Sequence, residues 1–271
     1  MVKKPALVSK EQENQLMTRS YQYKLNEPFI SLDFPQGALK FFVPNQICVW
    51  RVLTLFSKEP DTISWINGFQ ENEVFFDVGA NIGLYSLWAA FRAKSQVFSF
   101  EPEAENYNIL NQNLRANDLT QRCSAYCMGV ASGDEVTYLD TRLETGGASG
   151  HQVRDKAQTN RYQVGPTKRQ GIITRSLDQL VYDDGLPCPS HIKIDVDGIE
   201  PQIIHGARKL LEDKRVKEIL IELLLTDPTH VETMARIGEA GFSFDQGMLK
   251  DLEDKSKVSP RPGNLIFRRK T

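Results

Sequence analysis

The sequence predicts an α/β fold in which helices cover both faces of a mostly parallel sheet of seven strands. From about residue 73 onward, short apolar runs typical of buried strands alternate with longer segments of helical periodicity, and such alternation indicates a parallel sheet. A glycine-rich turn, Gly79 to Gly83, directly follows the first of these runs. We expect a main domain over residues 71–271 and a small extension over residues 1–70, which contains a hairpin and helices.

The composition is that of a globular protein and excludes several other classes. Hydrophobic residues make up 40% of the 271 residues, with 33 Lys and Arg against 35 Asp and Glu, so a disordered chain or a nucleic-acid partner is not expected. No apolar run approaches the roughly 18 residues of a membrane span, and the N-terminus lacks a signal-peptide core. Four scattered cysteines indicate reduced thiols, and we expect a cytoplasmic protein. The oligomeric state is not predicted.

The elements of the extension follow from turn and helix signals. Two apolar runs flank Pro35-Gln36-Gly37, which predicts a hairpin, and helices are expected over 47–56 and 61–69.

In the main domain, the run 74–78 suits a strand that is buried on both faces, and the residues after the glycine turn place apolar side chains on one helical face. The same reasoning predicts strands over 96–100, 125–131, 135–140, 191–196, 218–223, 242–244 and 265–268, and helices over about 107–117, 197–211 and 229–240.

The turn from Asp77 to Gly83 carries the clearest chemical signal. Glycine allows a backbone to approach a ligand closely, and open parallel sheets bind ligands outside the carboxyl ends of their strands. Glu101 ends the next strand, where its carboxylate can accept both hydroxyls of a ribose. Asn81 replaces the middle glycine of a dinucleotide-binding turn, and Asp77 suits a cationic amino group better than a phosphate. The pattern therefore favours S-adenosylmethionine.

Three segments resemble the FkbM family of S-adenosylmethionine-dependent methyltransferases. They are VFFDVGANIGLYSLWAA at 74–90, Phe100-Glu101-Pro102, and IKIDVDGIE at 192–200, within a region of resemblance over about 74–225. The family often has Glu at the position of Asp197, and the carboxylate is retained. The resemblance implies a class I methyltransferase fold, which is Rossmann-like, and usually O-methylation of a hydroxyl on a sugar, glycan precursor or natural product. Methylation of another small molecule at nitrogen and a non-catalytic cofactor-binding scaffold are the alternatives.

The resemblance also assigns a set of cofactor-binding residues by position. The methionine part of the cofactor would be held by the turn, the ribose by the residue at the end of the second strand, and the adenine by residues beside it and after the third strand. The residues are Asp77, Gly79, Ala80, Asn81 and Gly83 for the methionine part, Glu101 for the ribose, and Pro102, Gly129 and Val130 for the adenine side.

Methyl transfer to a hydroxyl requires alignment of the reacting atoms and removal of a proton. Asp195 and His151 are the predicted catalytic residues, with Asp197 and Glu222 as further candidates for the base. In a sheet of order 3-2-1-4-5, Asp77, Asp195 and Glu222 would converge, and like charges would raise their pKa values. Asp195 and Glu222 could instead hold Mg²⁺, while Asp197 could simply cap the next helix. We expect Lys193 to form an ion pair in the sheet.

An irregular stretch at about 143–171 is too long for an ordinary connection and suggests either a lid or a solvated loop. Its part from Arg154 to Arg169 contains five basic residues against one acidic residue. With the extension, it could close over a small-molecule or glycan acceptor and attract an anionic one. The remaining histidines are expected to be structural or, for His205 and His230, exposed.

Overall fold

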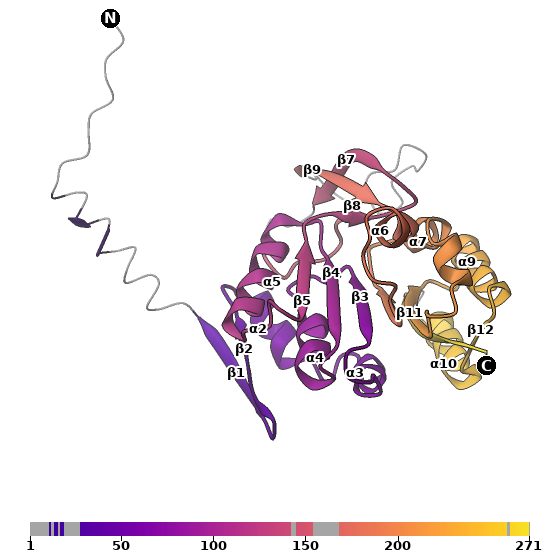
Figure 1. Cartoon of the computed structure of the whole chain (residues 1–271), viewed down its shortest axis with the longest axis horizontal. Helices are drawn as coiled ribbons and strands as arrows, with labels where there is room; N and C mark the ends of the chain where they lie inside the picture. The colour runs from indigo at the N-terminus through magenta and orange to yellow at the C-terminus, as the bar shows by residue number, and fades with distance from the viewer. Residues whose placement is uncertain are drawn as a thin grey trace, which may run out of the picture.

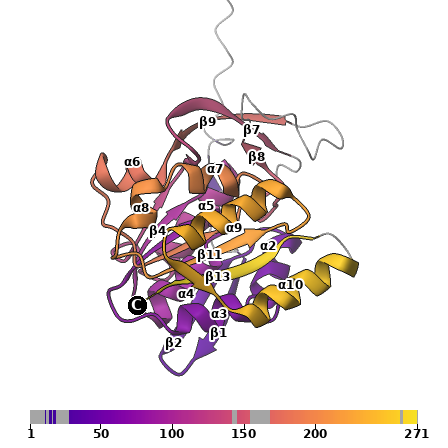
Figure 2. The ribbon, with the colours of Figure 1, turned by 90° about the vertical axis from the view of Figure 1, so that its right-hand side faces the viewer.

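The computed structural model describes residues 28–141, 145–153, 168–258 and 261–270, together with isolated residues between 11 and 18. Within these ranges the chain forms a central sheet with helices on both faces, a hairpin and a second sheet (Figures 1 and 2). The central strands are β3 (Val74–Val78), β4 (Gln96–Phe100), β5 (Cys123–Tyr126), β10 (His191–Ile194), β11 (Glu218–Leu223), β12 (Phe242–Phe244) and β13 (Gly263–Arg269).

The strand order in the central sheet is β12-β13-β11-β10-β3-β4-β5. The five strands from β5 to β11 pair in parallel, and β13 pairs antiparallel with β11 and β12. In chain order the core strands therefore lie as 3-2-1-4-5, and the predicted fold class is confirmed. This arrangement brings the carboxyl ends of β4, β3, β10 and β11 to one edge of the sheet, where ligands of open parallel sheets bind.

Each face of the sheet packs against its own apolar core, because successive side chains of a strand point to opposite faces. Phe75 belongs to the core that contains residues of α4 (Leu84–Arg92) and α5 (Ala104–Ala116). Phe76 belongs to the core that contains residues of α6 (Leu177–Tyr182), α7 (Glu200–His205), α8 (Arg208–Glu212) and α9 (Pro228–Glu239). A further helix, α10 (Gln246–Val258), precedes β13.

The extension contains the predicted hairpin, formed by β1 (Phe29–Phe34) and β2 (Gly37–Phe42), and two helices, α2 (Gln46–Leu53) and α3 (Pro60–Asn67). Leu39 and Phe41 of β2 and Ile66 of α3 are fully buried in the same core as α4. The extension thus shares its core with the sheet, and the division near residue 70 stays a prediction.

A second sheet of order β6-β9-β7-β8 lies at the upper end of the molecule in Figures 1 and 2. It contains β6 (Gly129–Val130), β7 (Glu135–Thr141), β8 (Gln152–Val153) and β9 (Lys168–Arg175). The third strand of the central sheet is present, but its predicted bounds of 125–131 are wrong: β5 ends at Tyr126, and residues 129–130 form β6, which pairs with β9 instead. The irregular stretch is also interrupted earlier than expected, by β8 and β9.

The helix predicted over about 197–211 starts later and is divided. Its first part, α7, has Ile199 at the N-cap without a capping side chain, and α8 follows after Gly206. A Cβ atom at Gly206 would lie 2.6 Å from the carbonyl oxygen of Ala131, so glycine permits close packing between the helix pair and the second sheet. Asp197 is therefore not a helix cap.

Candidate active site

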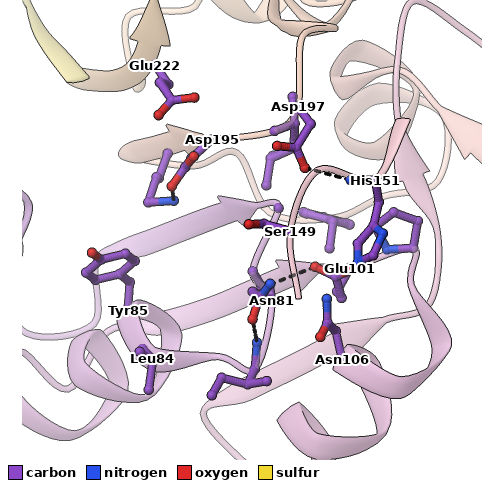
Figure 3. A pocket seen from close by; sticks show the side chains of 18 of the residues that line it. Asn81, Leu84, Tyr85, Glu101, Asn106, Ser149, His151, Asp195, Asp197 and Glu222 are labelled. Atoms are coloured by element: carbon purple, nitrogen blue, oxygen red, sulfur yellow. Dashed lines mark hydrogen bonds and ion pairs between the residues drawn. The ribbon is translucent and has the colours of Figure 1, made fainter. Parts of the chain in front are cut away.

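A cleft of about 1270 Å³, including the part open to solvent, lies at the carboxyl ends of β3, β4, β10 and β11. Its walls include the turn after β3, the segment after α2 and residues 148–151. Figure 3 shows Asn81 and Glu101 in one part of this cleft and Asp195 and Glu222 in another. The cleft thus combines two chemically different regions.

The turn after β3 packs tightly onto neighbouring backbone. Gly79 has φ +80°, and its N–H and that of Ala80 donate to the carbonyl of Phe100 at 3.0 and 3.1 Å. A Cβ atom at Gly79 would lie only 2.0 Å from the carbonyl oxygen of Asp195. Glycine is therefore required here by the close approach of the turn to the end of β10, and not only by the space that a ligand needs. Gly83, with φ +85°, precedes α4.

Glu101 lies where the sequence places it, in the wall of the cleft at the end of β4. Its carboxylate accepts the N–H groups of Asn81 at 2.7 Å and of Glu103 at 2.9 Å. Burial raises the pKa of Glu101 to about 7. Since each carboxylate oxygen has two acceptor positions, Glu101 retains capacity for further hydrogen bonds. Pro102 and, from the second sheet, Gly129 and Val130 also line the cleft.

Residues 145–151, here called the strap, cross from α2 to the end of β10 and are held mainly through their backbone. Asn81 donates its Nδ2 to the carbonyl of Ala148 at 2.8 Å, and Asn106 accepts the N–H of Gly147 at 2.7 Å. Asp197 accepts the N–H groups of Gly150 and His151 at 2.7 and 3.1 Å. Further bonds come from Asn45 and Arg51, at the start of α2 and within it. Asp197 therefore anchors the strap, a role that sequence reasoning missed.

His151, at the end of the strap, lines the cleft beside Glu101. Burial lowers its pKa, so the neutral imidazole is favoured. Of the basic residues expected near the acceptor, Arg154, Lys156 and Arg161 lie outside the described residues. Arg169 pairs with Asp140 at 3.3 Å on the second sheet and is not part of the cleft wall.

Lys193 organises the second region of the cleft. Its side chain is 1% exposed, and its Nζ lies 2.8 Å from Oδ2 of Asp195 and 3.9 Å from Oδ1 of Asp77. The ammonium also lies 5.0 Å from the centre of the Tyr85 ring, a favourable cation–π arrangement. The expected ion pair in the sheet is confirmed, and Lys193 itself lines the cleft.

Asp77 is fully buried behind the cleft wall. It accepts the hydroxyl of Ser86, which in turn contacts Ser99 at 2.7 Å between the two hydroxyl oxygens. Its direct contact with a ligand stays a prediction, which this buried position does not favour.

Glu222 lies on β11 next to Asp195. Ile194 and Ile221 are partners in the parallel pairing of β10 and β11, so the two residues that follow them lie side by side on one face of the sheet. Glu222 is half-buried. Burial, followed by the negative charge of Asp195, raises the pKa of Glu222 to about 8. The predicted convergence of carboxylates is therefore present, with Lys193 among them.

The alternative of a Mg²⁺ site at Asp195 and Glu222 finds no support, and the expectation for His230 is wrong. In the described part of the chain, no group of three or more His, Cys, Asp and Glu residues is arranged to hold a metal ion, and Asp195 has an ammonium as its partner instead. His230 is 7% exposed rather than exposed, since α9 begins against the end of β11 and the N–H of Leu224 donates to His230 Nδ1 at 3.3 Å.

The extension contributes Arg51, Thr54 and Lys58 to the cleft, which no motif in that region had indicated. None of the helices in the described ranges is long and apolar enough to cross a membrane.

Comparison with known proteins identifies related chains. The chain is 26% identical over 218 residues to the hexuronic acid methyltransferase AglP of Haloferax volcanii, which covers 80% of this chain and 83% of that protein. It is 23% identical over 226 residues to the methyltransferase sdnD of Sordaria araneosa, which covers 76% and 84% respectively. A solved structure of methyltransferase FkbM from Methylobacillus flagellatus aligns with a TM-score of 0.48 and 14% identity over 83% of this chain, which spans 56% of that chain.

The family model of the methyltransferase FkbM domain matches residues 77–244. This range holds the glycine turn, Glu101, the strap, Asp195 and Glu222, and it is well over half of the sequence. The chain therefore belongs to the FkbM methyltransferase family.

Proposed function

We propose that this protein uses S-adenosylmethionine to methylate a hydroxyl of a sugar, a glycan precursor or a natural product. The observation that carries the proposal is the division of the cleft. One region has a buried carboxylate, Glu101, with capacity for further hydrogen bonds beside a glycine turn, and the other holds the carboxylates Asp195 and Glu222. The first region suits a nucleoside, and the second suits a hydroxyl that must be oriented and deprotonated.

The residues of the first region fit S-adenosylmethionine. Glu101 would accept the ribose hydroxyls, the turn from Gly79 to Gly83 would adjoin the methionine part, and Pro102, Gly129 and Val130 would face the adenine. When bound, this cofactor supplies a methyl group carried on a positively charged sulfur atom.

The second region would orient the acceptor. Asp195 and His151 both line the cleft and are proposed to contact the acceptor, which keeps its hydroxyl in line with the methyl group. The acceptor of the relative AglP is named as a hexuronic acid. Arg51 and Lys58 also line this cleft, and either could face the carboxylate of a similar sugar.

Two experiments test the proposal. The melting temperature should rise with S-adenosylmethionine and remain unchanged with NAD; a ligand at 100 times its Kd stabilises a protein by about 2.7 kcal/mol. A methyl-transfer screen should then compare glucuronic acid, neutral sugars, nucleotide sugars and primary amines, with products identified by mass spectrometry. Absence of any stabilisation by S-adenosylmethionine would refute the cofactor, and methylation of amines alone would refute the hydroxyl acceptor.

A further inference from the structure

We propose that Glu222 removes the proton from the acceptor hydroxyl, while Lys193 holds Asp195 in place to bind that hydroxyl. The inference rests on the proposed function and assigns separate roles to two neighbouring carboxylates. It follows from how each carboxylate is partnered.

Asp195 is already committed to an ion pair. One of its oxygens lies 2.8 Å from Lys193 Nζ. The lysine cannot turn toward solvent, because its side chain is 1% exposed and lies between Asp77 and the ring of Tyr85. This fixed pair leaves the second oxygen of Asp195 to accept a hydrogen bond, which suits orientation of an acceptor.

Glu222 has the opposite situation. It lines the same cleft, and Figure 3 shows its carboxylate extending from β11 toward the region of Asp195. Among the described residues, the Glu222 side chain makes no hydrogen bond and no ion pair. Its neighbour in the pairing of β11 and β13, Asn264, donates its Nδ2 to Glu59 at 3.0 Å instead of to Glu222. Both oxygens of Glu222 are therefore available to a proton.

The surroundings of Glu222 are mainly acidic, and the buried cation beside it in the described part of the chain is Lys193. Charged groups approach it from β10, from the segment after β10, from the residues before α3, and from α7. They are Asp195, Lys193, Asp197, Glu59 and Glu200. Burial and this excess of carboxylates raise the pKa of Glu222 to about 8, and a base is most effective when its pKa lies near the working pH. Two carboxylates in different environments are a common way to divide such roles.

The hydroxyl proton of the acceptor passes to a carboxylate oxygen of Glu222, and the acceptor oxygen uses an electron pair to form the new bond to the methyl carbon. The bond from that carbon to sulfur breaks, and its electron pair remains on sulfur. The acid formed at Glu222 then releases its proton to solvent through the open side of the cleft.

Kinetics test the assignment with S-adenosylmethionine and glucuronic acid, or with whichever hydroxylated acceptor the screen identifies. Between about pH 6 and about pH 9.5, wild-type kcat should rise with pH as Glu222 ionises. Glu222→Gln should lower kcat by roughly 10²- to 10⁴-fold with little change in KM and should remove this dependence. Asp195→Asn should mainly raise KM and should shift the rise in kcat to lower pH, because it removes a negative neighbour of Glu222. Glu239→Gln, an exposed carboxylate on α9, is the control and should change none of these values.

A second measurement needs neither ligand. The pKa of Glu222 is higher in the folded protein than its usual 4.5, so its ionisation opposes folding increasingly as the pH rises toward 8. Glu222→Gln should therefore melt close to the wild-type temperature near pH 5 and at a progressively higher temperature than wild type up to about pH 8, with a constant difference above that pH. Glu239→Gln should show no such trend.

The outcomes are distinguishable. Failure of S-adenosylmethionine to bind the wild-type protein refutes the proposed function, and the proton-transfer role falls with it. If wild type transfers methyl groups and Glu222→Gln retains both its rate and its pH dependence, Glu222 is not the base. A melting difference that stays constant from pH 5 to pH 9 overturns the inference as well, because Glu222 then does not titrate in this range.

Discussion

Replacing Gly79 with alanine tests how tightly the cofactor turn packs on the strand that carries Asp195. The chain offers two matched comparisons, because Gly79, Gly83 and Gly185 have nearly equal φ angles of +80°, +85° and +78°. A Cβ atom would lie 2.0 Å from the Asp195 carbonyl oxygen at Gly79 and 2.2 Å from a Leu110 methyl at Gly83, and it would meet nothing within 4 Å at Gly185. The three variants therefore share the backbone strain and differ in what the new methyl group meets.

The expected costs follow from these contacts. The left-handed conformation costs an alanine roughly 1–2 kcal/mol, and this is the whole effect at Gly185. At Gly83 the leucine side chain can shift, and overpacking adds about 1–3 kcal/mol. At Gly79 the obstacle is the backbone of β10, which cannot rotate away, so the loss should exceed about 4 kcal/mol, a size reserved for such special sites. For a chain of this length each kcal/mol corresponds to roughly 2–4 °C in Tm.

Urea unfolding followed by circular dichroism measures the three free energies under one condition. The predicted loss of free energy of unfolding is smallest for Gly185→Ala, larger for Gly83→Ala and largest for Gly79→Ala. Equal losses for Gly79→Ala and Gly185→Ala would show that backbone conformation alone requires the glycine, and the argument from close approach would be refuted.

Three further predictions concern the cleft. Glu101→Ala should weaken S-adenosylmethionine binding by about 1–3 kcal/mol, measured by calorimetry, and an unchanged Kd would exclude it from the ribose site. Lys193→Met should lower the free energy of unfolding by about 3–5 kcal/mol, because it leaves buried carboxylates without their cationic partner. The double variant Lys193→Met with Asp195→Asn should recover part of this lost free energy. A double variant no more stable than Lys193→Met would contradict the ion-pair argument. Asn106→Ala should lower the free energy of unfolding by about 1–3 kcal/mol, because it leaves polar groups of the strap without hydrogen-bond partners. Asn111→Ala, on the same helix, should lower it by less in the same urea experiment. Equal losses would contradict the role of Asn106 in holding the strap.

The central sheet was predictable because its strands are buried on both faces and therefore consist of continuous apolar runs. The local sequence pattern alone predicts strands such as Val74–Val78 and Glu218–Leu223. The second sheet does not, since Gly129–Val130 contributes only two residues and Lys168–Arg175 contains charged residues with one face open to solvent. Its pairing depends on contacts between segments that are distant in the sequence, and local periodicity cannot predict such contacts.

In the site, sequence reasoning placed Glu101, Asp195 and Glu222 at one edge of the sheet, because a parallel topology brings strand ends together. It did not separate the roles of the carboxylates, which depend on the buried partner of Asp195. It also assigned Asp197 to a helix start, whereas the residue bonds to backbone groups about 46 positions earlier in the chain. Such long-range side-chain anchors have no signature in spacing.

The two carboxylates proposed to act in the cleft reduce the stability of the fold when they ionise. Glu101 and Glu222 have pKa values of about 7 and about 8, above those of the unfolded chain, so both subtract stability as the pH rises from about 4.5 to 8. Away from the cleft, Lys217 and His191 outweigh the effect of burial at Glu73 and hold its pKa at about 2. That carboxylate adds stability above about pH 4.5 and loses it as the pH falls toward 2. Ion pairs at the opposite end of the strands thus offset the cost of carboxylates whose high pKa values suit them to accept a proton.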